Sequence, residues 1–114
     1  MDALEVARSI VDALEEKKGE NIVLLDIHEV AFFTDYFVIC TGTSDRMLDS
    51  LAHAVVEQMK KKYAINGRIE GEPRGGWLVV DFSDVVLHLF SPDQRDYYNL
   101  EELWEEGKVL VRLQ

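Results

Sequence analysis

The segment TDYFVICTGTSDRMLDSLA, residues 34–52, contains a short apolar run, a turn and the start of an amphipathic pattern. Residues 36–41 are apolar toward both faces, and such strands usually lie inside a sheet that is covered on both sides. Residues 42–44 end the strand, and a helix capped by Ser44 or Asp45 is predicted to reach residue 63. Its predicted buried stripe consists of Leu48, Leu51, Ala52, Val55 and Met59. A covered strand that leads directly into a long helix favours an α/β fold over an exposed antiparallel sheet.

Helix and strand patterns continue on either side of this segment. Residues 2–18 predict an amphipathic helix that Gly19 ends, and residues 21–27 predict a strand. The patterns that follow the central helix are strands and then two short helices, which begin at Ser91-Pro92-Asp93 and at the capping-box pattern of Asn99 to Glu102. The expected strands cover residues 67–70, 77–82 and 85–90, with a loop over residues 70–76.

Charge and length limit the class of protein. The chain has 114 residues, which suits one domain, and twenty-two acidic against twelve basic residues give it a formal net charge of −10. This balance argues against a protein that follows nucleic-acid phosphates and against binding to an anionic membrane surface. It suits a partner with a basic surface, or it serves solubility.

Cysteine content and the start of the chain indicate the compartment. Cys40 is the only cysteine, so no intrachain disulfide can form, and its apolar surroundings predict a buried, inert thiol. The first eighteen residues lack the basic leader and apolar block of a signal peptide. We therefore expect a cytoplasmic protein without a membrane span.

The predicted hairpin of residues 77–90 has one plain face and one unusual face. With Ser83 and Asp84 as its turn, one face is wholly apolar, and the other carries Trp77, Val79, Asp81, Val86, His88 and Phe90. Large aromatic side chains beside a few polar groups are typical of protein-binding surfaces. The alternative is a second core layer in which Asp81 bonds His88 diagonally across the hairpin. The pattern alone leaves both interpretations open, because a one-residue change of register would exchange the faces.

No residue pattern predicts catalysis, a metal or a cofactor. The three histidines lie on separate elements, and none has a second metal ligand at a suitable spacing. The turn from Thr41 to Ser44 before a helix could hold an anion, but it lacks the lysine of a phosphate-binding loop.

Two long motifs resemble one known family. The first is TDYFVICTGTS, residues 34–44, and the second is WLVVDFSDVVLHLF, residues 77–90, followed by Arg95, Tyr98, Leu100, Glu101, Leu103 and Trp104. In this order and at this separation they are similar to the ribosomal silencing factor, or Iojap-like, family, over residues 2–106.

This resemblance implies a single nucleotidyltransferase-like domain, a mixed β-sheet flanked by helices, over residues 1–107. It implies a protein that is not an enzyme and that forms a homodimer. Such proteins bind the large ribosomal subunit through its ribosomal protein fourteen, block joining of the subunits and so repress translation. The spacing of Asp81 and Asp84 differs by one residue from the Asp-x-Asp metal pair that nucleotidyltransferases need.

The resemblance also implies contact residues. Trp77, Asp81, Asp84 and Tyr98 match the positions expected to touch the partner, and His88 and Phe90 are added from the unusual hairpin face.

Two alternative functions stay open. One is an assembly or maturation factor that docks on the same ribosomal protein, and the other is a nucleotide-using transferase. Residues 108–114 extend past the end that is usual in the family, and their alternating pattern predicts an added edge strand or a flexible tail.

Overall fold

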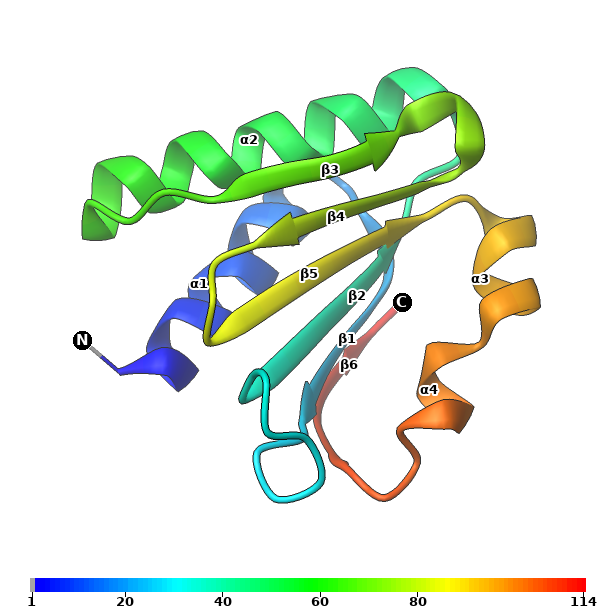
Figure 1. Ribbon diagram of the computed structural model, residues 1–114. Coiled ribbons are helices and arrows are strands. Elements are labelled where there is room, and N and C mark those ends of the chain that lie inside the picture. Colours follow the sequence, from blue (N-terminus) through cyan, green and yellow to red (C-terminus); the bar gives the residue numbers. More distant parts are fainter. Residues whose placement is uncertain (1) are drawn as a thin grey trace.

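A computed structural model describes residues 2–114 and shows one mixed six-stranded sheet with helices on both faces (Figure 1). The strand order is β3-β4-β5-β2-β1-β6. Only β2 and β5 pair in parallel, and every other pair among these strands is antiparallel. The strands are β1 (Glu20–Asp26), β2 (Tyr36–Thr41), β3 (Arg68–Glu72), β4 (Trp77–Asp81), β5 (Val85–Phe90) and β6 (Lys108–Leu113). The predicted α/β fold with a mixed sheet is confirmed.

Four α-helices accompany the sheet, and one short 3-10 helix, Pro73–Gly75, precedes β4. The α-helices are α1 (Ala3–Glu16), α2 (Asp45–Tyr63), α3 (Pro92–Tyr98) and α4 (Leu100–Leu103). Helix α2 has the predicted bounds, and Ser44 caps it by accepting a hydrogen bond from the Met47 backbone N–H at 3.0 Å. All five residues of the predicted stripe are buried.

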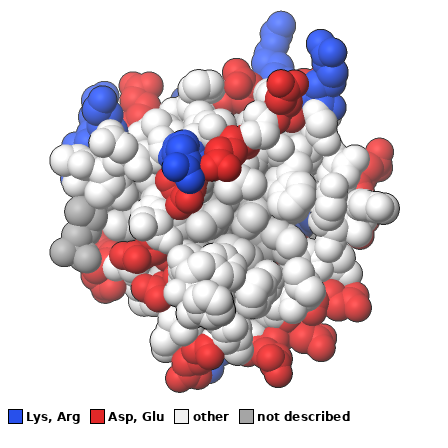
Figure 2. All heavy atoms as spheres, in the orientation of Figure 1, with Lys and Arg blue, Asp and Glu red and all other residues white. Residues whose placement is uncertain are grey.

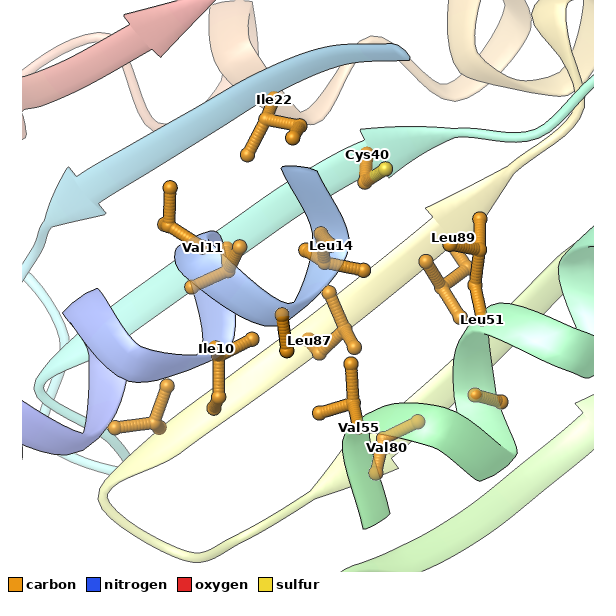
Figure 3. Packing of buried hydrophobic residues seen from close by; sticks show 14 of the residues in the cluster. Ile10, Val11, Leu14, Ile22, Cys40, Leu51, Val55, Val80, Leu87 and Leu89 are labelled. Carbon is orange, nitrogen blue, oxygen red and sulfur yellow. The ribbon is translucent and has the colours of Figure 1, made fainter. Parts of the chain in front are cut away.

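Helices α1 and α2 cover one face of the sheet and enclose an aliphatic core. Ile10 and Leu14 of α1 pack toward Leu87 of β5. Leu51 and Val55 of α2 lie in the same cluster and also face β5 (Figure 3). All five side chains are at most 1% exposed. Cys40 lies in this core at 0% exposure, and burial raises the pKa of its thiol to about 12, as expected for an inert cysteine.

The end of α1 differs from the prediction. Lys18, with φ 65°, takes the left-handed conformation that was assigned to Gly19 as the helix stop. Gly19 is needed for a different reason, because a Cβ atom there would lie 2.5 Å from the Cys40 sulfur. The close approach of two distant segments therefore sets this position, which the local pattern does not reveal.

Strand β3 also extends two residues further than predicted. Gly71 and Glu72, expected in a loop, pair with Leu78 and Trp77 of β4. Gly71 has φ 97°, and a Cβ atom there would lie 2.5 Å from the Trp77 carbonyl oxygen. Pairing with β4 thus continues the strand through a residue that normally marks a turn.

The last strand, β6, pairs antiparallel with β1 and forms an edge of the sheet. The edge-strand interpretation of residues 108–114 is therefore correct, and the flexible tail is not. Val111 and Leu113 pack against the aliphatic core, whereas Val109 is 48% exposed and Leu110 is 37% exposed. Residues 108–113 thus belong to the same sheet as the rest of the domain.

Helices α3 and α4 cover part of the opposite face, at the right of Figure 1. Beneath them lies a second cluster of buried side chains, which consists of Val23, Leu25, Ile27, Ala31, Phe37, Ile39, Phe90 and Leu100. The capping-box prediction at Asn99 is wrong. Asn99 has φ 45° and its side chain caps no backbone N–H, because its backbone also ends α3.

Candidate protein-binding surface

The β4–β5 hairpin has the predicted register. Trp77 pairs with Phe90, Val79 with His88 and Asp81 with Val86, so each alternate residue lies on the predicted face. Ser83, with φ 79°, supplies the left-handed residue that a two-residue hairpin turn requires. Asp81 supports this turn, since its Oδ1 accepts a hydrogen bond from the Ser83 backbone N–H at 2.7 Å.

His88 is bound to Trp77 and not to Asp81. The indole Nε1–H of Trp77 donates a hydrogen bond to His88 Nδ1 at 3.2 Å. The predicted diagonal bond between Asp81 and His88 is therefore wrong. His88 is 7% exposed, and burial lowers its pKa to about 4. The imidazole is thus neutral near pH 7, and its proton resides on Nε2 because Nδ1 accepts the indole bond.

Phe90 lies beneath two aromatic rings. Its side chain is 0% exposed, with Trp77 stacked on it at a ring-centroid distance of 5.0 Å and Tyr98 at 6.3 Å. The expectation that Phe90 and His88 lie on an open surface is wrong, because α3 brings Tyr98 back over the hairpin. Trp77 and Tyr98 lie 4.5 Å apart and form the outer layer, with Tyr98 45% exposed.

The two predicted carboxylates differ in their surroundings. Asp81 Oδ2 pairs with Arg68 Nη2 at 3.4 Å, and Arg68 also pairs with Glu70 at 3.0 Å. Asp84 is exposed in the turn, and its backbone carbonyl accepts hydrogen bonds from the N–H groups of Asp35 and Tyr36 at 3.0 and 3.1 Å. The carboxylate of Asp84 thus lies at the opposite end of β5 from Trp77 and Tyr98.

Arg95 holds α3 and α4 in place, a role that the sequence analysis missed. Its guanidinium donates to Glu101 at 2.9 and 3.3 Å, to Thr41 Oγ1 at 2.8 Å and to the carbonyl oxygen of Asn21. The side chain is 11% exposed. The sequence contains one signal for this role, because Arg95 is the only basic residue between residues 91 and 107, among several carboxylates. Arginine and a carboxylate frequently form such a bidentate ion pair.

The face that carries α3 and α4 is uncharged over most of its centre. Figure 2 shows white side chains there, red carboxylates along the sides and lower border, and blue basic groups along the upper border and in a mixed charged cluster at upper left. We call this the aromatic face, and its members are Phe32, Phe33, Phe37, Trp77, His88, Phe90, Tyr97, Tyr98 and Trp104. Phe32, Phe33 and Tyr97 are 102%, 55% and 79% exposed, and the sequence analysis did not single them out.

The turn before α2 offers few free groups that could bind a phosphate, as a nucleotide-using transferase would require. The Ser44 hydroxyl caps the helix, and the Thr41 hydroxyl accepts a bond from Arg95. A cavity of about 480 Å³ lies beside Arg95, and Arg112, Glu20, Asp96 and Glu101 line it as well. Its three carboxylates outnumber its two guanidinium groups, and Glu101 already pairs with Arg95, so the cavity offers no net positive charge to phosphate oxygens.

Residues 2–114 contain no group of three or more His, Cys, Asp or Glu side chains placed to hold a metal ion. No helix in the same range is long and apolar enough to cross a membrane.

Comparison with known proteins identifies the family. The family described as ribosomal silencing factor during starvation matches residues 1–113. The chain belongs to this family. A ribosomal silencing factor from Halalkalibacterium halodurans is 35% identical over 110 residues, which cover 96% of this chain and 94% of the relative. The corresponding factor from Bacillus subtilis is 35% identical, with 96% and 92% coverage.

Organelle proteins and solved structures also match. A mouse protein named for mitochondrial assembly of the ribosomal large subunit is 36% identical over 83% of this chain and 43% of its own length. A Chromobacterium violaceum protein of known crystal structure is 34% identical, with a TM-score of 0.87 over 92% of this chain and 88% of the other. The resemblance noted in the two motifs is thus confirmed for both family and fold.

Proposed function

We propose that this ribosomal silencing factor binds the large ribosomal subunit through ribosomal protein fourteen and sterically blocks joining of the small subunit. Translation would fall without any catalytic step, in the cytoplasm. The observation that carries the proposal is the family match over residues 1–113. The aromatic face supplies a surface of suitable chemistry for such an interaction.

Trp77 and Tyr98 are the proposed anchors of this interaction. Half-buried aromatic side chains that already rest on other rings lose little conformational freedom on binding. Phe90 supports both rings from below, and His88 holds the indole through its hydrogen bond. We therefore assign the direct contact to Trp77 and Tyr98, and a supporting role to His88 and Phe90.

Carboxylates around the anchors favour a basic protein over ribosomal RNA. The chain carries a net charge of −10, so RNA phosphates would repel it wherever a basic protein does not intervene. Asp81 and Asp84 are proposed to face basic side chains of the partner. This docking constraint explains how so acidic a chain could bind a particle made largely of RNA.

The test is binding of the purified chain to large ribosomal subunits, followed by a subunit-joining assay. The double variant Trp77→Ala/Asp81→Ala should weaken binding roughly thirtyfold or more, about 2 kcal/mol, and should restore joining. The matched control is His53→Ala on α2, where His53 is exposed and lies 3.4 Å from the carboxylate of Asp49. Equal affinity of the double variant and the wild type would refute the assigned contact site.

Assembly or maturation of the large subunit is the second candidate, and the name of the mouse relative favours it. The two functions use the same docking site and differ in the particle that is bound. Sedimentation of cell extracts separates them, because a maturation factor migrates with precursor particles and a silencing factor with mature large subunits. A homodimer is also proposed, and sedimentation velocity of the free chain measures it directly.

A further inference from the structure

Two adjacent phenylalanines stand out on the loop that joins β1 to β2. Phe32 is 102% exposed and Phe33 is 55% exposed. Leu103 of α4 is 70% exposed. It directly precedes Trp104, whose ring meets Phe33 at 5.8 Å, and it lines a surface hollow together with Tyr97 and Tyr98. Apolar side chains that gather on a surface mark interaction sites more often than single exposed ones do.

The base of this loop is held by the fold. Ile27 accepts backbone hydrogen bonds from Val30 and Ala31 at 3.0 and 2.8 Å, and Ala31 is 7% exposed. The Phe33 ring packs against Phe37 at 6.0 Å and against Trp104 at 5.8 Å. Phe32 is therefore presented to solvent from an anchored turn.

Ring contacts connect this loop to the proposed anchors without a break. Phe33 touches Phe37, whose ring meets His88 at 4.5 Å, and His88 is bonded to Trp77. Phe32 meets Phe33 at 6.4 Å at one end of the aromatic face, and Tyr97 meets Tyr98 at 5.0 Å at the other. A strip of ring contacts thus runs from Phe32 to Tyr97, and its middle part consists of the buried Phe37 and His88.

Charge around the Phe32 end indicates the kind of partner. Residues 27–35 contain Glu29 and Asp35 but no lysine or arginine. Residues 99–107 contain four glutamates and again no lysine or arginine, and the one basic residue that follows, Lys108, pairs with Asp26 across the β1–β6 ladder. Figure 2 shows mostly red groups along the lower border of this view. The same border on a second copy would repel it, whereas a basic surface would be attracted.

We propose that Phe32, Phe33 and Leu103 form a second contact area, which binds a basic protein surface next to the one contacted by Trp77 and Tyr98. The inference rests on the proposed function, because the occupant is the same large-subunit partner. Phe32 inserts into an apolar recess of that partner, and Glu102, Glu105 and Glu106 pair with lysines or arginines around it, while Glu101 stays paired with Arg95.

The experiment compares three chains in binding to large ribosomal subunits: wild type, Phe32→Ala/Leu103→Ala and the control Leu110→Ala. Leu110 is exposed to 37% on β6 and makes none of the ring contacts of the strip. Phe32 and Leu103 are largely exposed, so their removal should leave the fold intact, which a circular dichroism melt verifies. We expect at least tenfold weaker binding for the double variant and less than twofold for the control.

Each result bears directly on the second contact area. Equal binding of wild type and double variant overturns the second contact area and leaves the proposed function standing. A wild-type chain that does not bind large subunits overturns both. Sedimentation velocity of the free chains supplies the last arm: a wild-type dimer that Phe32→Ala/Leu103→Ala converts to monomer would place a second copy on this surface and contradict a basic partner.

Discussion

The face of the sheet beneath α1 and α2 is filled with aliphatic side chains, whereas the face beneath α3 and α4 is filled with rings. The first is closed, since two long helices cover it and its central residues have no exposure. The second is covered only in part, by two short helices, of which α3 packs on β5 and reaches β1 and β2 through Arg95. One sheet therefore separates a stabilising core from a surface suited to a partner.

The two faces of the sheet contribute differently, one to stability and the other to a surface suited to a partner. Aliphatic side chains interdigitate densely, so a change of even one methylene is felt in the free energy of unfolding. Rings stacked at the edge of a core keep one side open for contact while the other side is buried. Substitutions on the two faces should therefore affect different measurements.

The largest effect on stability is expected for Leu87→Ala. Leu87 is 0% exposed on β5 and meets both α1 and α2 (Figure 3). The cavity should lower the free energy of unfolding by about 4 kcal/mol, as measured by urea denaturation. Val86→Ala, the half-buried neighbour on the aromatic face, should cost less. An equal loss for the two variants would remove the distinction between the faces.

The next effect is a loss of stability on acidification that depends on His88. The native imidazole has a pKa of about 4, whereas the unfolded one titrates near 6.5. Between these values the unfolded state binds the extra proton, so stability falls as the pH is lowered from 6.5 to 4, by at most about 3 kcal/mol. His88→Gln should lack this component in urea titrations across that range. Parallel pH profiles of the two chains would contradict the neutral, buried imidazole.

A moderate effect is expected for Arg95→Met, which releases α3 and α4 from the sheet. Its charged hydrogen bonds to Glu101 and Thr41 are lost, at a cost of about 2 kcal/mol. In a Trp104→Phe background, Trp77 is the only tryptophan, and its emission should shift to the red as Tyr98 moves off the indole. The exposed Arg74, changed to Met, is the control and should leave the emission unchanged.

The smallest effect on stability is expected for Phe32→Ser. Its ring is fully exposed, so the free energy of unfolding should change by no more than about 0.5 kcal/mol. Thermal melts and urea curves measure this directly. A clear loss in the free energy of unfolding would show that Phe32 packs within the fold. It would contradict the contrast between an exposed ring here and the closed aliphatic core.

Much of the fold was predictable because its signals are local. Strands at residues 36–41 and 85–90 and the helix at residues 45–63 have the predicted bounds. Each has a single, clear apolar period, and Ser44 caps the helix by accepting a hydrogen bond from the Met47 backbone N–H, three residues further on. The hairpin register followed from the two-residue turn, which determines the pairing of every residue beyond it.

The errors occurred where distant segments meet. Phe90 was predicted to be open, but α3 and Tyr98 cover it. The alternative in which Asp81 bonds His88 is also wrong, because Trp77 supplies the hydrogen bond to His88. The side chain of Asn99 was predicted to cap α4, but the backbone of Asn99 takes the left-handed conformation that ends α3. The errors at Phe90 and Asn99 depend on the path of residues 91–107 back over the sheet, which no local pattern encodes, whereas the Trp77–His88 bond lies within the hairpin itself.

By itself, the sequence determined the elements, the two faces of the hairpin and the acidic charge, because period, turn length and composition are properties of neighbouring residues. Only the tertiary structure decided which aromatic rings are open, which are buried and which side chain holds each of them. Burial depends on the segment that folds over a surface, and Arg95 sets that segment here through contacts with residues that are 54 and 74 positions away.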